Sequence, residues 1–234
     1  MIKSKENTKP RQSARQKEGK QSSLFQEEIP VWYDQRGKVC SKWLSRCEEE
    51  RKQTMEMLEE IASLENLTKA YRQVKKNGGS AGVDGETVRE FGGWLNKHHK
   101  ELIRELLTTK YKPSLVKGVE IPKANGGKRM LGIPTVKDRV IQQAISQVMS
   151  RYYELTFTES SHGFRRNRGT RGALTEACNY IKEGKRSIVD IDLEKFFDEV
   201  NQNRLMRQLS LRIGDRRVLD LIRKTLRSGI LIGG

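Results

Sequence analysis

The sequence predicts an α+β fold that is rich in helices and carries a small antiparallel sheet. Apolar residues recur at spacings of three and four over residues 41–77 and 86–108, as on one face of an amphipathic helix. Residues 119–134 instead form two apolar runs on either side of a Gly-Gly pair, which is typical of a β-hairpin. Residues 188–193 alternate apolar side chains with aspartates, which is typical of a half-buried strand. Helices should therefore predominate around a few short strands.

The charge balance points to a polyanionic partner. The chain of 234 residues has 46 Lys and Arg against 30 Asp and Glu, a net charge of +16. Nucleic acid is the commonest partner of so basic a protein, and an anionic membrane surface is the alternative. No apolar run approaches the roughly 18 residues that span a bilayer, and the N-terminus lacks the apolar segment of a signal peptide. We therefore expect a soluble, cytoplasmic protein without a membrane partner.

The first part of the chain divides by composition. Residues 1–30 are rich in Lys, Arg, Gln and Ser and contain almost no large apolar residues, so they are predicted to be a disordered basic tail. The tail adds affinity for RNA or is only a solvated extension; the sequence leaves both open. Residues 31–63 are predicted to be an N-terminal helical extension. The helical pattern of residues 41–77 should break near Ser63.

A glycine-rich stretch, Asn77–Gly85, ends this helical pattern. Its four glycines indicate a backbone with positive φ angles or a close approach to another group. The stretch either cradles a phosphate or is a plain connecting loop, and it lacks the Lys-Ser/Thr of a Walker loop. A further amphipathic helix is predicted from Pro134 to Tyr152-Tyr153.

Two cationic stretches suit phosphate groups. The predicted hairpin presents Lys123, Lys128 and Arg129, which would suit a triphosphate because Arg grips phosphate oxygens bidentately and Lys adds a point charge. Residues 165–171 contain four arginines and no acid. Repulsion among these four arginines would cost stability if no anionic partner were present. This stretch is therefore the strongest candidate in the chain for binding a polyphosphate.

The acidic stretch at 188–198 is a local negative region in a basic chain. If residues 188–193 form a strand, Asp190 and Asp192 share one face, where carboxylates could hold a hard cation such as Mg²⁺. The alternative is a strand end whose solvated acids run into a helix N-terminus. Beyond it, helices are predicted over 202–212 and 215–227, followed by the start of a strand at 230–232.

The order of four motifs resembles that of bacterial group II intron-encoded reverse transcriptases, also called maturases. The motifs are Leu-Gly-Ile-Pro at 131–134, Lys-Asp-Arg-Val-Ile-Gln-Gln-Ala at 137–144, Gly-Phe-Arg at 163–165 and Val-Asp-Ile-Asp-Leu-Glu-Lys-Phe-Phe-Asp at 189–198. The resemblance covers residues 64–234. It implies helix-rich fingers over 64–184 and the first part of the palm over 185–234, incomplete at the C-terminus.

The resemblance also implies roles for individual residues. Asp192 would be the first catalytic aspartate and would bind two Mg²⁺ ions, with the main chain of Leu193 as a further ligand and Asp190 as electrostatic support. Phe197 would be the steric gate under the sugar. The nucleotide triphosphate would be bound by Lys123 and Arg129, and RNA by Lys128, Arg165 and Arg168.

The function implied is that of an RNA-directed DNA polymerase. It would extend a DNA primer on an RNA template with deoxynucleoside triphosphates, and would bind group II intron RNA to aid splicing. The family's Tyr-Ala-Asp-Asp motif, thumb and maturase domain are absent from the 234 residues. We therefore expect an N-terminal portion that is inactive on its own. A non-catalytic RNA-binding module and a reverse transcriptase of the retron or defence type remain alternatives, and a homodimer is left open.

Overall fold

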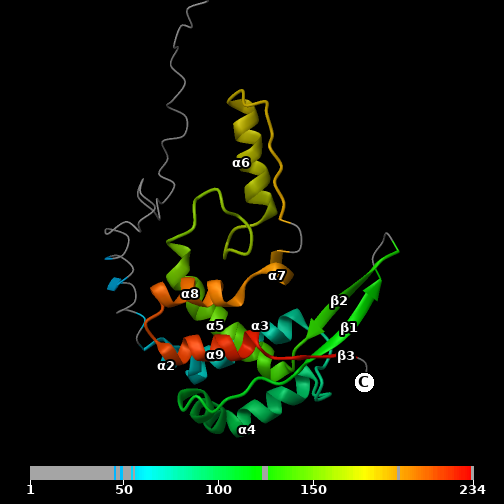
Figure 1. The fold of residues 1–234 in the computed structure, drawn as a ribbon, viewed down its shortest axis with the longest axis vertical. Coiled ribbons are helices and arrows are strands. Elements are labelled where there is room, and N and C mark those ends of the chain that lie inside the picture. The colour runs from blue at the N-terminus through cyan, green and yellow to red at the C-terminus, as the bar shows by residue number, and fades with distance from the viewer. Residues whose placement is uncertain are drawn as a thin grey trace, which may run out of the picture. The chain divides into compact units, whose positions relative to one another are not determined.

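The computed structural model describes residues 45, 48, 49, 54, 56–122, 126–193 and 196–232. The predicted basic tail at 1–30 and most of the extension at 31–63 lie outside the described residues, as does Lys123 in the hairpin. The helix-rich α+β class is confirmed by the arrangement of helices and strands in Figure 1.

The first described helices break where the sequence predicted. Helix α2 spans Met57–Ala62 and helix α3 spans Leu64–Asn77. Between them the hydroxyl of Ser63 accepts a hydrogen bond from the backbone N–H of Asn66 at 3.2 Å. An N-cap of this kind satisfies one of the backbone donors that the first turn of a helix leaves free, so α3 begins here.

Two longer helices complete the helical layer around the core. Helix α4 spans Val88–Leu107 and begins with a reciprocal capping box between Thr87 and Glu90. Helix α5 spans Val136–Glu154. The apolar stripes of these helices meet in one buried core, to which the last helix also contributes: Leu58, Ile61, Leu67, Phe91, Leu102, Leu106, Ile141, Val148 and Val218.

The sheet is small and mixed. Strand β1 spans Val116–Pro122, β2 spans Lys128–Ile133 and β3 spans Ile230–Ile232. Strands β1 and β2 form the predicted antiparallel hairpin, and β3 lies parallel to β1 on its other side, in the order β2-β1-β3 (Figure 1). The strand predicted at residues 230–232 is thus present, and the sheet is antiparallel only in its hairpin.

Of the four remaining helices that the structure describes, the sequence predicted the last two. Helix α6 spans Thr170–Lys182, the short α7 spans Phe196–Glu199, α8 spans Gln202–Arg212 and α9 spans Arg216–Leu226. Helix α9 buries Val218 and Leu221, whereas no residue of α6 is buried. Among the described residues, no helix combines the length and the apolar character that crossing a membrane requires.

The half-buried strand predicted at residues 188–193 is wrong for this structure. These residues have no regular secondary structure, and the side chains of Ile188, Val189, Ile191 and Leu193 are 63–88% exposed. A strand needs a neighbour that accepts and donates its backbone hydrogen bonds. The described sheet contains only β1, β2 and β3, so the alternating pattern has no strand to pair with among the described residues.

The glycine-rich stretch packs closely against the start of α5. A side chain at Gly82 would place its Cβ 2.6 Å from the Cα of Thr135, which no real structure tolerates. Gly79 has a φ of 105°, and the guanidinium of Arg139 donates to the carbonyl oxygens of Gly78 and Ser80 at 3.3 and 2.8 Å. Close approach to α5 therefore explains these two glycines.

A buried carboxylate joins the segment before β1 to the same end of α5. Asp138 is 3% exposed and accepts hydrogen bonds from the Tyr111 hydroxyl at 2.5 Å, the Ser114 N–H at 3.1 Å and the Thr135 hydroxyl at 2.6 Å. Burial, followed by the charge of Asp138, raises the pKa of Tyr111 well above its ordinary value, so its hydroxyl stays protonated and donates. The segment leading into β1 is thereby fixed to α5.

We predict that Asp138→Ala lowers the free energy of unfolding by about 2–4 kcal/mol, because it leaves two buried hydroxyl donors, those of Tyr111 and Thr135, without this acceptor. Urea unfolding followed by circular dichroism measures this. The matched control is Asp220→Ala, which removes only a surface pair with Lys224 and should cost less than about 1 kcal/mol. Equal losses in the two variants would contradict the role given to Asp138.

Candidate nucleic-acid interface

The loop between α5 and α6 is closed by one buried arginine. The Nε and Nη2 atoms of Arg165 donate to Glu154 Oε1 at 3.1 and 2.7 Å, and its Nη1 donates to the carbonyl oxygens of Thr158 and Ser161 at 2.5 and 3.0 Å. Its side chain is 5% exposed. The structure thus places Arg165 inside the loop, with all three guanidinium nitrogens bonded to protein, and its contact with RNA stays a prediction.

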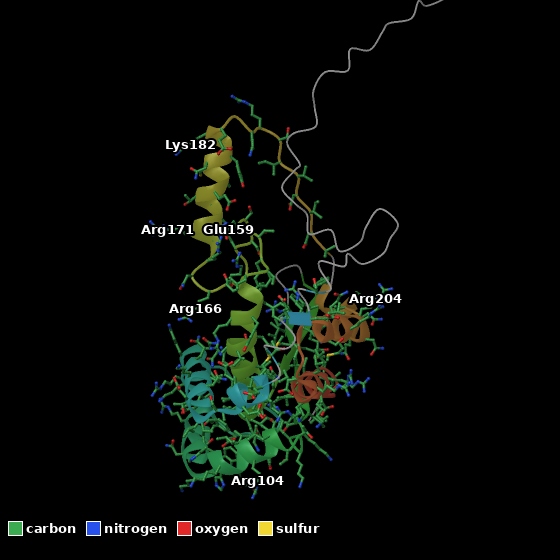
Figure 2. The ribbon with its side chains drawn as sticks, turned by 90° about the vertical axis from the view of Figure 1, so that its left-hand side faces the viewer. Arg104, Glu159, Arg166, Arg171, Lys182 and Arg204 are labelled. Carbon is green, nitrogen blue, oxygen red and sulfur yellow. The ribbon has the colours of Figure 1, made fainter. Side chains whose placement is uncertain are left out.

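The closed loop turns the neighbours of Arg165 outward. Phe164 is fully exposed and has a φ of 57°, and Asn167 has a φ of 60°. Residues other than glycine rarely adopt this left-handed conformation, which persists only where surrounding contacts enforce it. Arg166 is exposed as well (Figure 2). The loop therefore exposes the ring of Phe164 and the cation of Arg166 on either side of the buried Arg165.

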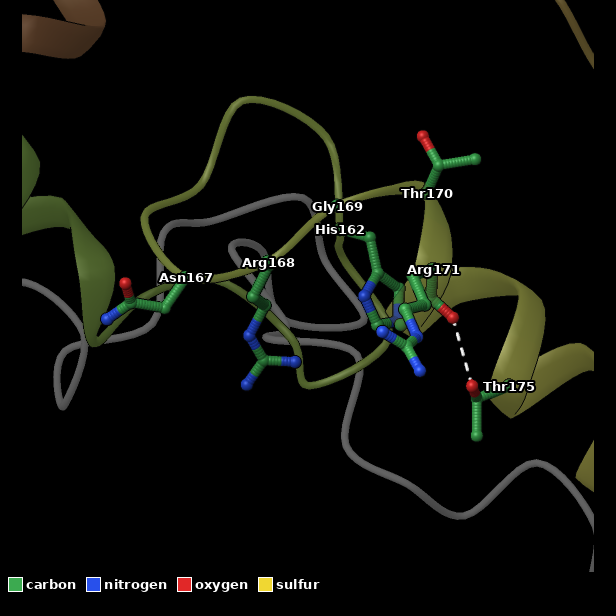
Figure 3. Close-up of a pocket in the computed structure, with 8 residues that line it drawn as sticks. His162, Asn167, Arg168, Gly169, Thr170, Arg171 and Thr175 are labelled. Carbon is green, nitrogen blue, oxygen red and sulfur yellow. Dashed lines mark hydrogen bonds between the residues drawn. The ribbon is translucent and has the colours of Figure 1, made fainter.

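A cavity of about 760 Å³ lies where this loop meets α6 (Figure 3). Arg168 and Arg171 line it, and the hydroxyl of Thr175 donates to the carbonyl oxygen of Arg171 at 3.0 Å. Arg168 is bonded to both the carbonyl and the carboxylate of Glu159. Two of the four arginines of residues 165–171 are thus paired with acids: Arg165 with Glu154 at the end of α5, and Arg168 with Glu159 of the loop.

His162, on the same cavity, bonds to α6. Its Nε2 lies 2.6 Å from Glu176 Oε2, and Tyr180 donates to the other oxygen of Glu176 at 2.8 Å. The hydrogen bond with His162, followed by those from Tyr180 and Ser160, lowers the pKa of Glu176 to about 2. Hydrogen bonds to a carboxylate favour its charged form, so Glu176 holds the loop to α6 as an anion.

The hairpin offers one paired and one unpaired cation for the predicted triphosphate contact. Lys128 Nζ lies 2.7 Å from Glu120 Oε2 on the neighbouring strand. Arg129 is exposed, sits opposite Ile121 in the sheet register, and forms no ion pair in the part of the chain that the structure describes. The roles of Arg129, Lys128 and the undescribed Lys123 in binding phosphate stay predictions.

The acidic stretch is exposed throughout its described part. Asp192 Oδ1 accepts a hydrogen bond from the backbone N–H of Leu193 at 2.9 Å, and Leu193 itself is 63% exposed. Phe197 is 81% exposed and meets Phe196 edge-on, with ring centroids 5.6 Å apart. No hydrogen bond or ion pair among the described residues joins this stretch to the hairpin or to the arginine-rich loop.

The described residues do not by themselves form a Mg²⁺ site. Within the described ranges, no three side chains of His, Cys, Asp or Glu gather closely enough to hold a metal ion. Asp190 and Asp192 are two carboxylates on an exposed, extended segment, whereas Mg²⁺ requires near-octahedral oxygen ligands. Among the described residues, Asp192 and Leu193 therefore have no further ligands with which to bind a metal ion, and their metal role stays a prediction.

The structure also reveals a groove that the sequence did not predict. It has a volume of about 1160 Å³ and lies between α3 and α5. Lys69, Arg72 and Lys76 line it from α3, and Gln143 and Gln147 line it from α5. The helical spacing of the three cations is visible in the sequence, but the packing of α3 against α5, which turns them toward a polar helix face, is not.

The comparisons with known proteins identify the family. The family of reverse transcriptases (RNA-dependent DNA polymerases) matches residues 121–231, which include the second strand of the hairpin, the arginine-rich loop and the acidic stretch. This segment, slightly less than half of the chain, therefore matches the reverse transcriptase family. The chain's relatives include group II intron-encoded proteins.

Two relatives show the extent of the similarity. The group II intron-encoded protein LtrA of Lactococcus lactis subsp. cremoris is 33% identical over 165 residues, which are 69% of this chain and 27% of that protein. The putative COX1/OXI3 intron 1 protein of Saccharomyces cerevisiae is 28% identical over 175 residues, which are 75% of this chain and 21% of that protein. The chain thus spans about a fifth to a quarter of these curated relatives.

Solved structures are similar to this chain as well, and one example shows the extent of the similarity. It is a chain of a partial Cas6-RT-Cas1–Cas2 complex, 20% identical, with a TM-score of 0.49, covering 75% of this chain and 28% of that chain.

We predict that the pKa of Glu176 is near 2 and that His162→Ala raises it toward the ordinary value of 4.5. Because the folded-state pKa is depressed, the stabilisation that Glu176 provides is complete above about pH 4.5 and is lost as the pH falls through about 2. Carboxyl chemical shifts followed by NMR during an acid titration measure the pKa. His99→Ala on α4 is the control, and an unchanged pKa in His162→Ala would contradict the assignment.

Proposed function

We propose that this chain contributes the fingers, residues 64–184, and part of the palm, residues 185–234, to an RNA-directed DNA polymerase of the group II intron type. The observation that carries the proposal is the family match over residues 121–231, within which the cationic turn and second strand of the hairpin, the arginine-rich loop and the acidic stretch follow one another. The net charge of +16 supports a nucleic-acid partner.

In this proposal the reaction is the extension of a DNA primer on an RNA template by deoxynucleoside triphosphates. Arg129, with Lys123, would bind the triphosphate, because cations on a hairpin can surround phosphate oxygens. The exposed ring of Phe197 would lie under the sugar and exclude a 2′-hydroxyl by steric clash. Each of these side chains would act by binding or orienting the nucleotide.

Asp192 would provide one carboxylate of the metal site. Reverse transcriptases generally use Mg²⁺, which stabilises the charge of the transferring phosphoryl group. Because the described residues do not complete a Mg²⁺ site, we assign to Asp192 only a share in one, with Asp190 adding negative charge beside it. Further carboxylates are needed for catalysis.

The proposed partners are an RNA template with its primer and a group II intron RNA. The name of the Lactococcus relative describes that protein as intron-encoded, and the same association is proposed for this chain. The alternative is an RNA-binding protein without catalysis. Nothing among the described residues supports the homodimer.

We predict that Asp192→Ala reduces primer extension by about 100-fold or more, since a lost metal ligand removes several kcal/mol of transition-state stabilisation. The assay uses an RNA template, Mg²⁺ and deoxynucleotides. It compares this chain with a chimera in which the chain's aligned segment replaces that of LtrA. RNA binding by the variant should be unchanged, and Asp220→Ala is the control.

The outcomes separate the alternatives. Extension by the chimera that disappears in Asp192→Ala supports the polymerase, whereas extension that survives this change contradicts the role of Asp192. If the chimera is inactive while the chain binds RNA, the alternative of an RNA-binding protein is favoured.

We also predict that the affinity of this chain for RNA falls about tenfold or more between about 50 and 200 mM salt, because bound Lys and Arg release counterions from phosphates. Fluorescence anisotropy with a labelled RNA measures the dissociation constant at each salt concentration. A flat response would count against RNA binding as such.

A further inference from the structure

The groove between α3 and α5 has a fixed floor. The side-chain amide of Asn66 on α3 donates to the carbonyl oxygen of Ala144 on α5 at 3.1 Å. The side-chain amide of Gln147 on α5 donates to Asn66 Oδ1 at 2.8 Å in return. Because these bonds run between the two helices in both directions, the two walls of the groove keep a constant spacing.

The groove carries cations that no carboxylate neutralises. Three of its cations are paired: Lys69 with Glu65, Arg151 with Glu60, and Arg165 with Glu154. Three others, Arg72, Lys76 and Arg166, form no ion pair in the described part of the chain. Because the groove's three glutamates are all engaged, its net charge is positive. A polyanion is therefore the ligand that its charge suits.

Arg72 and Lys76 are spaced to meet successive charges. They lie one turn apart on α3, so their heads are separated by about 6 Å along the helix axis. Phosphates of an extended nucleic-acid strand repeat at a similar distance. On the α5 side of the groove, the side chains of Gln143 and Ser146 have no hydrogen-bond partner among the described residues. These amide and hydroxyl groups can donate to, or accept from, base edges and ribose hydroxyls.

One end of the groove holds an exposed aromatic ring. Phe164 lines the groove and also lines a neighbouring apolar pocket of about 400 Å³ that includes Met149 and Phe157. The ring is held there by the closed loop of Arg165. Exposed rings next to cations are platforms on which the bases of single strands stack.

The other end holds an arginine with a spare donor. The Nε atom of Arg139 is buried and has no hydrogen-bond partner in the described structure. Arg139 lines a cavity of about 410 Å³ that shares Gln143 and Ser146 with the groove. Its guanidinium therefore adds a positive charge beside this end of the groove, where it favours an anionic ligand.

From these contacts we infer that the α3/α5 groove binds single-stranded RNA. The backbone lies along Arg72 and Lys76, a base stacks on Phe164 beside Arg166, and the strand continues toward Arg139. The inference rests on the proposed function in so far as both require RNA binding, but it assigns that binding to a place outside the hairpin and the acidic stretch. A duplex would not stack a base on Phe164, because its bases are already stacked.

The test compares two triple variants of the whole chain by fluorescence anisotropy. The groove variant is Arg72→Gln, Lys76→Gln and Arg166→Gln. The control variant removes the same charge from α4, which does not line the groove: Lys97→Gln, Lys100→Gln and Arg104→Gln (Figure 2). The probe is a labelled single-stranded RNA of about 12 nucleotides, within the range of single-strand site sizes.

We expect the groove variant to raise the dissociation constant about tenfold or more. The slope of the logarithm of the binding constant against the logarithm of the salt concentration should become less steep by about 1 to 2, because the phosphate contacts of Arg72 and Lys76 and the nearby charge of Arg166 are lost. The control should change the dissociation constant less than about threefold, through the general field alone. Phe164→Ala should weaken single-stranded RNA about tenfold and leave duplex RNA unchanged. Leu155→Ala, which removes an exposed side chain of the same loop, is its control.

Each contrary outcome has a distinct meaning. If both triple variants lose the same affinity for the RNA, the groove is not the binding site, although the chain still binds RNA. Tighter binding of duplex RNA, or of poly-glutamate, would overturn the assignment of a single strand. If the unmodified chain binds no RNA, both the groove and the proposed RNA binding fail. Circular dichroism spectra of all variants should match, since every changed residue is exposed.

Discussion

The structure depends on the placement of the N-terminal end of α5, and Asp138 fixes it. Its buried carboxylate accepts hydrogen bonds from Tyr111, Ser114 and Thr135, so the segment before β1 and the start of α5 share one acceptor. The next residue, Arg139, holds the glycine-rich loop to the same place. The segment that leads into the hairpin and the glycine-rich loop are thus both fixed to the start of α5.

Much of this framework could be predicted from the sequence because it depends on local patterns. The 3.6-residue periodicity predicts α3, α4 and α5, Ser63 marks the break between α2 and α3, and the Gly-Gly pair predicts the hairpin. These features are decided by residues that are neighbours in the chain. The motifs that resemble reverse transcriptases were likewise sufficient to identify the family, which the match to residues 121–231 confirms.

The features that the sequence did not predict depend on distant partners. Alternation at 188–193 predicts a strand, but a strand forms only where a neighbour completes its hydrogen bonds, and the described residues provide none. Four neighbouring arginines look alike in the sequence, whereas the fold buries Arg165 against Glu154 and leaves Arg166 exposed. The α3/α5 groove needs two helices that are about 70 residues apart in the chain to pack together, as Asn66 and Gln147 do.

We assign the chemistry on the nucleotide and the binding of the RNA strand to different parts of the chain. The hairpin and the acidic stretch carry the residues proposed to act on the nucleotide, and the α3/α5 groove carries those proposed to bind the RNA strand. Photo-crosslinking tests this division directly. A single-stranded RNA containing 4-thiouridine is irradiated with the chain, and the attached peptides are identified by mass spectrometry. We predict RNA–peptide adducts in α3 and in the loop around Phe164. Adducts confined to α4 or α9 would contradict this division.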